Sequence, residues 1–355
     1  MLNYYFCVGY RSEKGNGGIR SFCYSEEKNE IVPLPSHWEG FAPSYMAISR
    51  GRKHIAAAAE TINGGVFVIL QRDALNEPFQ LSAMEELSKT DRFSHCSFSR
   101  DDRFILATNY MSGSVQSYQI DNKASRVIPA DRKSQMGFGH GPNAERQESS
   151  HPHSAFQSDA SGFIAVSDLG ADILCIYQMD DSGKLALINQ WKAEAGSGPR
   201  HTAFSHDGKR CYLLTELSSC IHGFHVDDGG NLAEICRISA LQPEYQGYSL
   251  ASEIRISANG KYLYAANRGG NTIAHFCIEE DGCLTNPRFV STRGWPREFA
   301  LTDDGRYMLV LDEEFADSKG ELEVFAIDGQ NGALKTTDAW IPLPGAYTLE
   351  FAYAV

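Results

Sequence analysis

The stretch HTAFSHDGKRCYLLTE, residues 201–216, contains the pattern that decides the fold. Two short runs of strand-forming residues flank the turn sequence HDGK, which is typical of a β-hairpin. Five similar segments start at residues 45, 95, 153, 253 and 298, so that neighbouring units, with residue 201 included, start 45 to 58 residues apart. Self-similarity at this period is typical of solenoids and β-propellers.

Each unit continues beyond its hairpin. A third strand-like run, such as GGVFVIL or NTIAHFCI, follows a loop that contains Gly, Asn or Ser, and a weaker fourth run closes the unit. Helical periodicity is nearly absent. The sequence therefore predicts an all-β protein built from four-stranded antiparallel units.

The seventh unit is divided between the two ends of the chain. YTLEFA, from residue 347, supplies only a first strand, whereas NYYFCVGY, GGIRSFCY and NEIVPLP near the N-terminus supply the second, third and fourth strands. A closed ring needs this arrangement because it leaves no sheet edge unpaired at the closure. We therefore expect a single seven-bladed β-propeller domain over residues 1–355, with its last blade closed by the N- and C-terminal strands.

Composition restricts the classes of partner. The chain of 355 residues is 42% hydrophobic and 22% charged, and its formal net charge of -13 argues against binding to nucleic acid or to an anionic membrane. The N-terminus lacks a signal-peptide pattern, and no apolar run approaches the roughly 18 residues of a membrane span. Nine cysteines without a C-x-x-C pair indicate buried, reduced thiols in a cytoplasmic protein. The oligomeric state stays open.

The repeat brings polar residues into register. The first strand of a blade lines the channel of a propeller, and it starts where the antiparallel second strand ends, so polar residues at both places are expected around one channel mouth. Polar strand ends often have structural roles only, but three arginines among them (Arg200, Arg268 and Arg297) favour an anionic ligand. With the first residue of each unit as position 0, that position carries Tyr45, His95, His153, His201, Glu253, Glu298 and Tyr347, and position 15 carries Glu60, Tyr110, Asp168, Glu216, Arg268 and Glu313.

A metal site is the main alternative for the histidines. Zinc prefers three or four converging His, Cys or carboxylate ligands. The proline between His151 and His153 does not establish that both rings reach one ion, and the nearby arginines would repel a cation. We therefore expect neither a metal nor another cofactor.

Four segments resemble the blade motifs of the lactonase family of seven-bladed propellers. They are SHPHSAF with VSDLGAD, GSGPRHTAFSHDGKRCYLLTELSS, SEIRISANGKYLYAANRGGNTIAHF and GWPREFALTDDGRYM. The resemblance runs from PSYMAIS to about residue 325. The family includes propeller-type 6-phosphogluconolactonases and fungal 3-carboxy-cis,cis-muconate lactonizing enzymes. It implies the propeller fold and a small anionic lactone or muconate-like substrate.

The resemblance also implies a set of site residues. The family's catalytic positions fall on His153, Arg200, Glu216 and Arg268. One departure concerns VLDEEFADSKGELEV, which has acids at Asp312, Glu313 and Glu314 where the family commonly has VANQ-SDNI. These acids would disfavour a phosphorylated substrate if they faced the site. Residues expected to contact substrate are His151, Asp168, His201 and Arg297, with His95 and Glu60 added from the ring of polar residues.

The leading hypothesis is hydrolysis of a sugar lactone, with 6-phosphogluconolactone as the first candidate and the pentose phosphate pathway as its setting. His153 is favoured as the general base because histidine titrates near neutral pH, and Glu216 would orient or assist it. Cycloisomerisation of a carboxymuconate on the same scaffold is the second hypothesis. A non-catalytic binding platform is the third, since the fold does not dictate function.

Overall fold

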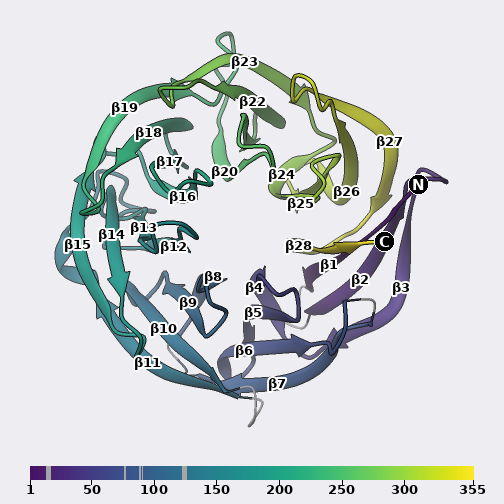
Figure 1. Cartoon of the computed structure of the whole chain (residues 1–355), viewed down its shortest axis with the longest axis horizontal. Coiled ribbons are helices and arrows are strands. Elements are labelled where there is room, and N and C mark those ends of the chain that lie inside the picture. Colours follow the sequence, from purple (N-terminus) through teal and green to yellow (C-terminus); the bar gives the residue numbers. More distant parts are fainter. Residues whose placement is uncertain (13–16, 76, 88, 90, 122–125) are drawn as a thin grey trace.

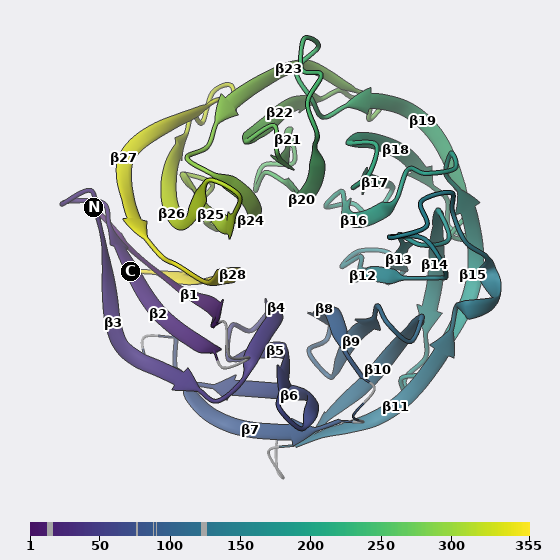
Figure 2. The same cartoon turned by 180° about the vertical axis from the view of Figure 1, so that it is seen from behind.

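The computed structural model describes residues 1–12, 17–75, 77–87, 89, 91–121 and 126–355. Seven four-stranded antiparallel sheets form a ring around a common centre, as Figures 1 and 2 show from opposite sides. The seven-bladed β-propeller expected from the repeat is confirmed. In the described ranges the single helical segment is the short turn η1 (Met136–Phe138), and no helix there is long and apolar enough to cross a membrane.

Four concentric sets of strands make up the ring, and the first set lines the channel. First strands are β4 (Ala42–Ile48), β8 (Phe93–Phe98), β12 (Pro152–Gln157), β16 (Pro199–Phe204), β20 (Leu250–Ile256), β24 (Trp295–Leu301) and β28 (Ala346–Ala354). Second strands are β5 (His54–Thr61), β9 (Phe104–Asn109), β13 (Ile164–Asp168), β17 (Arg210–Thr215), β21 (Tyr262–Arg268), β25 (Tyr307–Phe315) and β1 (Asn3–Arg11). Third strands are β6 (Gly64–Gln71), β10 (Ser114–Asp121), β14 (Ile173–Met179), β18 (Cys220–Val226), β22 (Thr272–Ile278), β26 (Ser318–Ile327) and β2 (Gly17–Ser25). Fourth strands are β7 (Gln80–Glu86), β11 (Arg126–Ser134), β15 (Leu185–Lys192), β19 (Leu232–Ser239), β23 (Leu284–Ser291), β27 (Leu334–Pro342) and β3 (Glu30–Glu39).

The two ends of the chain close the ring as predicted. The C-terminal strand β28 pairs with β1, and the order of this sheet is β28-β1-β2-β3. Both termini lie in this blade in Figure 1. The closing blade packs against the blade formed by β24 to β27 through a shared core. Phe6, Leu309 and Leu349 of this core are fully or almost fully buried. Such burial stabilises the closure mainly through the hydrophobic effect.

A six-residue turn joins the first and second strands of six blades. Its first residue can be used to align equivalent positions of these blades. The backbone amide of the first turn residue donates to the carbonyl five residues later, as in Ser205 to Arg210 (3.0 Å) and Ser158 to Phe163 (2.8 Å). His153 therefore lies five residues before its turn, as Arg200 does. The sequence frame that made His153 the counterpart of His95 and His201 is wrong by one residue. The equivalent turn residues are Ser49, Ser99, Ser158, Ser205, Ser257 and Thr302.

All seven first strands have a β-bulge close to their start. A bulge leaves a residue out of the ladder and re-aims its side chain. The bulge recurs in every blade and presents eight unpaired residues around one channel mouth, two of them from β20, and several of the eight are charged or titratable. These residues, here called the bulge ring, are Ser44, Ser94, His153, Arg200, Ser252 with Glu253, Arg297 and Tyr347.

The buried carboxyl group of Asp312 lies at a blade position where two other blades have asparagine. In the ladders, Phe93 pairs with Asn109, Ala251 with Asn267, and Pro296 with Asp312. The asparagine amides donate hydrogen bonds, for example from Asn109 to Asp91 (2.7 Å). In contrast, Asp312 is fully buried, and its burial together with the carboxyl group of Glu323 raises its pKa.

Replacing Asp312 by asparagine is therefore expected to stabilise the protein at alkaline pH. The unfolded pKa of aspartate is about 4, and a raised folded pKa means that stability declines as the pH rises from about 4 through the folded value. Asp312→Asn removes this decline and raises the unfolding free energy by about 1 to 3 kcal/mol at pH 8, with little effect at pH 4. Urea titrations at both pH values measure it, with the exposed Asp228→Asn as control. An equal decline with pH in Asp312→Asn and wild type would contradict the prediction.

Candidate active site

Glu216 is the centre of a charged cluster at the channel mouth where the first strands begin. It directly follows β17 and is 2% exposed. Its Oε1 accepts from Arg146 Nη2 (2.6 Å), and its Oε2 accepts from Arg200 Nε (2.8 Å) and lies 3.1 Å from Arg268 Nη2. One carboxylate thus faces three guanidinium groups, which leaves two positive charges uncompensated within the cluster. Guanidinium groups bind carboxylate and phosphate in a fixed two-pronged geometry.

The three arginines reach Glu216 from different parts of the fold. Arg200 is the bulge residue of β16, and its Nη1 also donates to the carbonyl of Ser252. Arg268 ends β21, and its Nε donates to the carbonyl of Leu250 at 3.2 Å. Arg146 comes from the loop before β12, and its side chain is one-third exposed. Arg200 and Arg268 are therefore fixed by the blades, whereas Arg146 closes the cluster from a loop.

Burial and charge act in opposite directions on the pKa of Glu216. Burial alone would raise it, yet the guanidinium groups of Arg268, Arg200 and Arg146 lower it far below its usual range. Burial also lowers the pKa of Arg268 to about 10. Glu216 is therefore ionised throughout the physiological range and is a poor acceptor of a proton.

His153 lies beside the cluster as its titratable group. Its Nε2 is 3.9 Å from Glu216 Oε2, and its Nδ1 has no hydrogen-bond partner among the described residues. Burial, followed by the positive charge of Arg200, lowers the pKa of His153 well below its usual value. Tyr110 contacts the His153 ring edge-on, with 5.9 Å between ring centroids. The imidazole is neutral at pH 7 and has a free nitrogen that can accept a proton.

His201 connects the arginine cluster to the channel below it. Arg200 Nη1 lies 3.2 Å from His201 Nε2, and His201 Nδ1 lies 3.1 Å from Glu253 Oε2. A guanidinium group can only donate, so Nε2 accepts, and the proton of the neutral ring resides on Nδ1. Tyr45 also approaches Glu253, at 3.4 Å. His201 thus positions Arg200 and does not contact Glu216 by a hydrogen bond.

His151 and Asp168, both expected at the site, act through other residues. His151 stacks on Tyr110 with 4.2 Å between centroids, and its ring nitrogens face the Tyr110 carbonyl (2.8 Å) and Glu148 (2.9 Å). Asp168 accepts from the backbone amides of His151 (2.8 Å) and Ala171 (2.9 Å). Asp168 therefore holds the segment that carries His151, and His151 fixes Tyr110 against His153.

Arg297 belongs to a second group of charges at the same mouth. Its guanidinium lies 3.6 Å from the centroid of the Tyr347 ring and 3.1 Å from Glu313 Oε2. Arg11, which the sequence did not indicate, lies 3.9 Å from the centroid of the same ring. Glu60 is the next-to-last residue of β5, where it pairs with Ala42, and its charge acts on Arg11. Glu313 thus already neutralises Arg297.

His95 lies deeper than the other expected site residues. It is fully buried, and its ring is 4.2 Å from that of Tyr45 and 4.4 Å from that of Phe156 between centroids. Its Nδ1 accepts from the amide of Ala155 at 3.4 Å. His95 therefore packs in the channel wall below the bulge ring and makes no contact with Glu216.

The structure adds Arg146 to the residues expected from sequence. It lies seven residues before His153, in a Gly-containing loop without strand pattern, so the repeat gives it no position.

A metal centre finds no support in the geometry. Across the ranges that the structure describes, no three or more His, Cys, Asp and Glu side chains are arranged to hold an ion.

Comparisons with known proteins agree with this architecture. The family described as "Lactonase, 7-bladed beta-propeller" matches residues 5–351. A 6-phosphogluconolactonase of Bacillus subtilis (strain 168) is 28% identical over 372 aligned positions that cover 100% of both chains. The periplasmic gluconolactonase of Pseudomonas aeruginosa superimposes with a TM-score of 0.86 at 25% identity and 99% coverage of each chain. A Lactobacillus plantarum protein superimposes with a TM-score of 0.85 at 25% identity, covering 98% of this chain and 99% of its own. This chain therefore belongs to the lactonase family of seven-bladed β-propellers.

Proposed function

We propose that this protein hydrolyses a small anionic sugar lactone, with 6-phosphogluconolactone as the first candidate. The observation that carries the proposal is the buried Glu216 facing three arginines, with a neutral His153 3.9 Å from its carboxylate. The surplus positive charge fits an anionic substrate and the oxyanion that forms when water attacks a lactone carbonyl. The names of a full-length relative, a 6-phosphogluconolactonase, and of a structural neighbour, a gluconolactonase, support the same reaction class.

In the proposed mechanism, His153 removes a proton from the attacking water. Its lowered pKa keeps it neutral, and general-base catalysis contributes about 10²- to 10⁴-fold in rate. Arg200 and Arg268 stabilise the oxyanion, because they are held rigidly by the blades. Glu216 stays ionised and orients these arginines without itself taking a proton. Glu216 therefore has a positioning role.

Arg146 is proposed to bind the anionic group of the substrate. Glu313 pairs with Arg297, and Arg11 donates to neutral groups of Pro43 and Ser44. The larger uncompensated charge at the mouth is therefore that of the three arginines around Glu216, and Arg146 is the most exposed of them. Arg146→Ala is expected to raise KM for 6-phosphogluconolactone about tenfold or more, with a smaller effect on kcat. KM for unphosphorylated gluconolactone should change little.

The control for Arg146→Ala is Arg237→Ala, which removes an exposed arginine paired with Glu194 on an outer strand. Steady-state kinetics of both variants on both lactones measure the effect. Equal losses on the two lactones would contradict a role for Arg146 in binding phosphate.

The proposed reaction is tested directly by measuring lactone hydrolysis above the spontaneous background. 6-Phosphogluconolactone, gluconolactone and carboxymuconate are assayed separately with the purified protein. Turnover of 6-phosphogluconolactone in preference to gluconolactone supports the proposal, whereas preference for gluconolactone, which carries no charge, would support lactone hydrolysis but contradict an anionic substrate. Turnover of carboxymuconate alone would favour cycloisomerisation, and no turnover of any of them would favour a binding module.

We further propose that the protein works in the cytoplasm. All nine cysteines are free thiols, and five of them are buried. Free thiols persist in reducing compartments. Cell fractionation followed by activity assay tests this location.

A further inference from the structure

A cavity of about 580 Å³ opens at the end of the channel opposite Glu216. Its walls include the final residues of the first strands, such as Ile48, Phe98 and Ile256, whereas the bulge ring lies at the beginnings of these strands. A first strand of six residues spans roughly 20 Å, which separates the two sites. The volume is in the range of small-molecule binding sites. We call this cavity the lower channel pocket.

The first strands determine which side chains surround the pocket. Side chains of a strand alternate between its faces, so the residue three positions after each bulge residue lies on the same face as the residue directly after the bulge. Six of the seven residues at this position line the pocket, and Ala203 lines the adjoining cavity. In the ring of seven residues so defined, five are uncharged and four of these are small. Arg255 and Glu350 are the two charged members. The ring consists of Ala47, Ser97, Phe156, Ala203, Arg255, Ala300 and Glu350.

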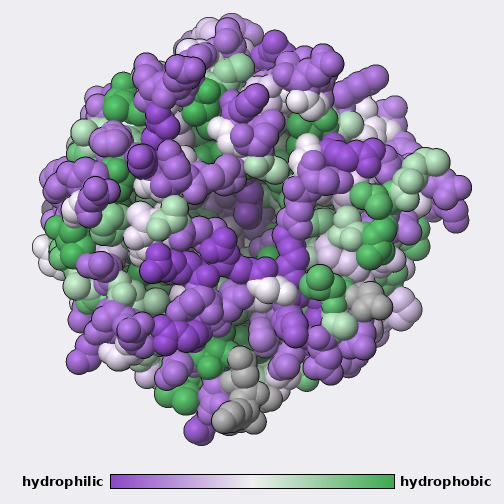
Figure 3. Space-filling view, viewed as in Figure 1, coloured by the Kyte–Doolittle hydropathy of each residue, from purple (hydrophilic) through white to green (hydrophobic). Residues whose placement is uncertain are grey.

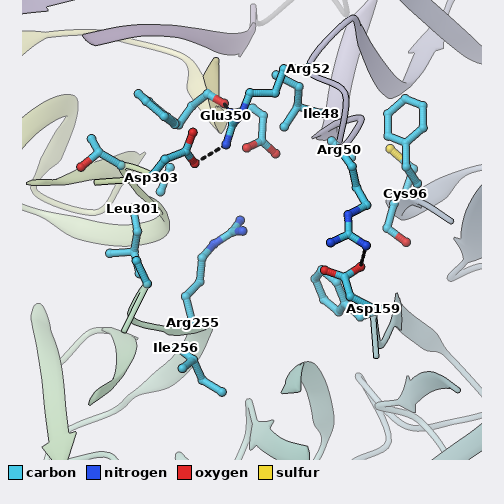
Figure 4. Close-up of a pocket in the computed structure, with 18 of the residues that line it drawn as sticks. Ile48, Arg50, Arg52, Cys96, Asp159, Arg255, Ile256, Leu301, Asp303 and Glu350 are labelled. Atoms are coloured by element: carbon cyan, nitrogen blue, oxygen red, sulfur yellow. Dashed lines mark hydrogen bonds and ion pairs between the residues drawn. The ribbon is translucent and has the colours of Figure 1, made fainter. Parts of the chain in front are cut away.

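The guanidinium group of Arg255 points into the pocket, as Figure 4 shows. Its Nε donates to the carbonyl of Phe299 at 3.0 Å. Its Nη1 and Nη2 make no hydrogen bond with any residue that the structure describes, and the ion pairs to Glu253 and Glu298 are 3.9 Å long. Glu253 is shared with His201. The two terminal nitrogens are thus free to donate to a ligand.

Glu350, on β28, faces the same space in Figure 4. Burial raises its pKa to about 7, and the charges of Arg255 and Arg52, with a backbone hydrogen bond of Phe351, lower it only in part. Within the described ranges no side chain forms an ion pair with Glu350 at 4.0 Å or less, and this includes Arg255. Two opposite charges therefore face one cavity without touching each other.

The other charges at this mouth are already paired. Arg52 pairs with Asp303, and Arg50 lies 2.9 Å from Asp159, both at the rim of the pocket. Figure 3 shows a hydrophilic hollow at the centre of the face that it presents. Of the charged groups around the pocket, Arg255 and Glu350 are thus the two whose polar atoms remain available at its base.

We propose that the lower channel pocket binds a small zwitterion of the α-amino acid type, whose carboxylate pairs with Arg255 and whose ammonium group pairs with Glu350. A simple anion would complete the pairing of Arg255 but add repulsion from Glu350, Glu253 and their neighbours. A simple cation would have the reverse problem with Arg255. A ligand that carries both charges satisfies both groups, and the small residues of the ring leave room for it.

The experiment compares ligands that carry both charges with ligands that carry one. Calorimetric titrations of the whole protein at pH 8, where the Glu350 carboxylate predominates, use glycine and L-alanine, with acetate, methylammonium and glycerol as matched probes. The zwitterions are expected to bind at least tenfold more tightly than any of the other three. Glu350→Gln, which keeps the shape of the side chain, is expected to lose at least tenfold in affinity for glycine, as is Arg255→Gln. Arg146→Ala, at the other mouth, should leave glycine binding unchanged.

Three results would overturn the assignment. The first is acetate, methylammonium or glycerol binding as tightly as glycine. The second is unchanged glycine binding in folded Glu350→Gln, as checked by circular dichroism. The third is the absence of any binding with a Kd below about 10 mM. Arg255→Gln leaves the carboxylates around it unpaired. If it fails to fold for this reason, the comparison of the five ligands on the wild-type protein and the affinity of Glu350→Gln for glycine still test the proposal. Lactone hydrolysis is measured separately, so its failure leaves this proposal standing.

Discussion

Glu216→Gln is expected to lower the unfolding free energy by about 3 to 5 kcal/mol and to reduce kcat/KM by at least about 100-fold. Glutamine keeps the size and the acceptor oxygen of the side chain but removes the negative charge. Arg200 and Arg268 would then remain buried next to Arg146 with no counter-charge, since Glu216 is the carboxylate common to all three. Removing one partner of a buried pair costs far more than the pair itself contributes.

Glu313→Gln is the matched control for this variant. Glu313 occupies the same position of its blade but is 20% exposed and pairs with one arginine, Arg297. Glu313→Gln leaves one partly exposed guanidinium group, which still stacks on Tyr347, so its cost is expected to be well below that of Glu216→Gln. Urea unfolding followed by circular dichroism measures both variants, and phosphate should restore more stability to Glu216→Gln than to wild type, because it binds the vacated charges of the folded state. Equal stability of the two variants would contradict the role given to Glu216.

The sequence predicted the ring and the mouth at which the candidate site lies, because both follow from the repeat. Strand alternation and turn residues recur in each unit, and the divided seventh unit indicates closure. The ladders confirm that first strands start where second strands end, as Leu250 opposite Arg268 and Trp295 opposite Glu313 demonstrate. These features depend on local patterns, which a single sequence displays.

The bulges could not be predicted in the same way. HSAF at residue 153 matches HTAF at residue 201, so the sequence aligns the two histidines. In the ladders, however, Ser154 pairs with Ser167 and His201 with Leu214, and His153 is left out as the bulge residue. A one-residue shift changes the face of a strand on which a side chain lies. His153 and Arg200 both reach Glu216 for this reason.

Arg146 and Arg11 lay outside the reach of the repeat. Arg146 contacts Glu216 across 70 residues of sequence, from the loop between β11 and β12. Arg11 ends the second strand of the closing blade and donates to Ser44 of the next blade at 2.6 Å. Contacts of this kind depend on how blades and loops are placed in three dimensions. The period of the sequence repeat and the spacing of residues within it do not contain this information.

His153→Gln is expected to reduce kcat on the lactone substrate by about 10²- to 10⁴-fold, with a smaller change in KM. Glutamine has a similar volume but cannot take a proton from water. His225→Gln, on an exposed position of β18, is the control and should keep full activity. A kcat within a factor of three of wild type in His153→Gln would remove His153 from the mechanism and leave the arginine cluster to act alone.

The pH dependence of wild-type kcat/KM gives an independent test of His153. An ordinary histidine is half protonated near pH 6.5, but burial and Arg200 lower the pKa of His153 well below this value. The basic form therefore persists as the pH falls, and kcat/KM should stay level from pH 8 down through pH 6.5 before it declines. The same shift predicts that the folded state loses stability below about pH 6.5. In that range His153 becomes protonated in the unfolded chain but stays neutral in the folded protein. His153→Gln should lose both the acid limb of the rate profile and this part of the acid destabilisation, because one buried imidazole causes the two.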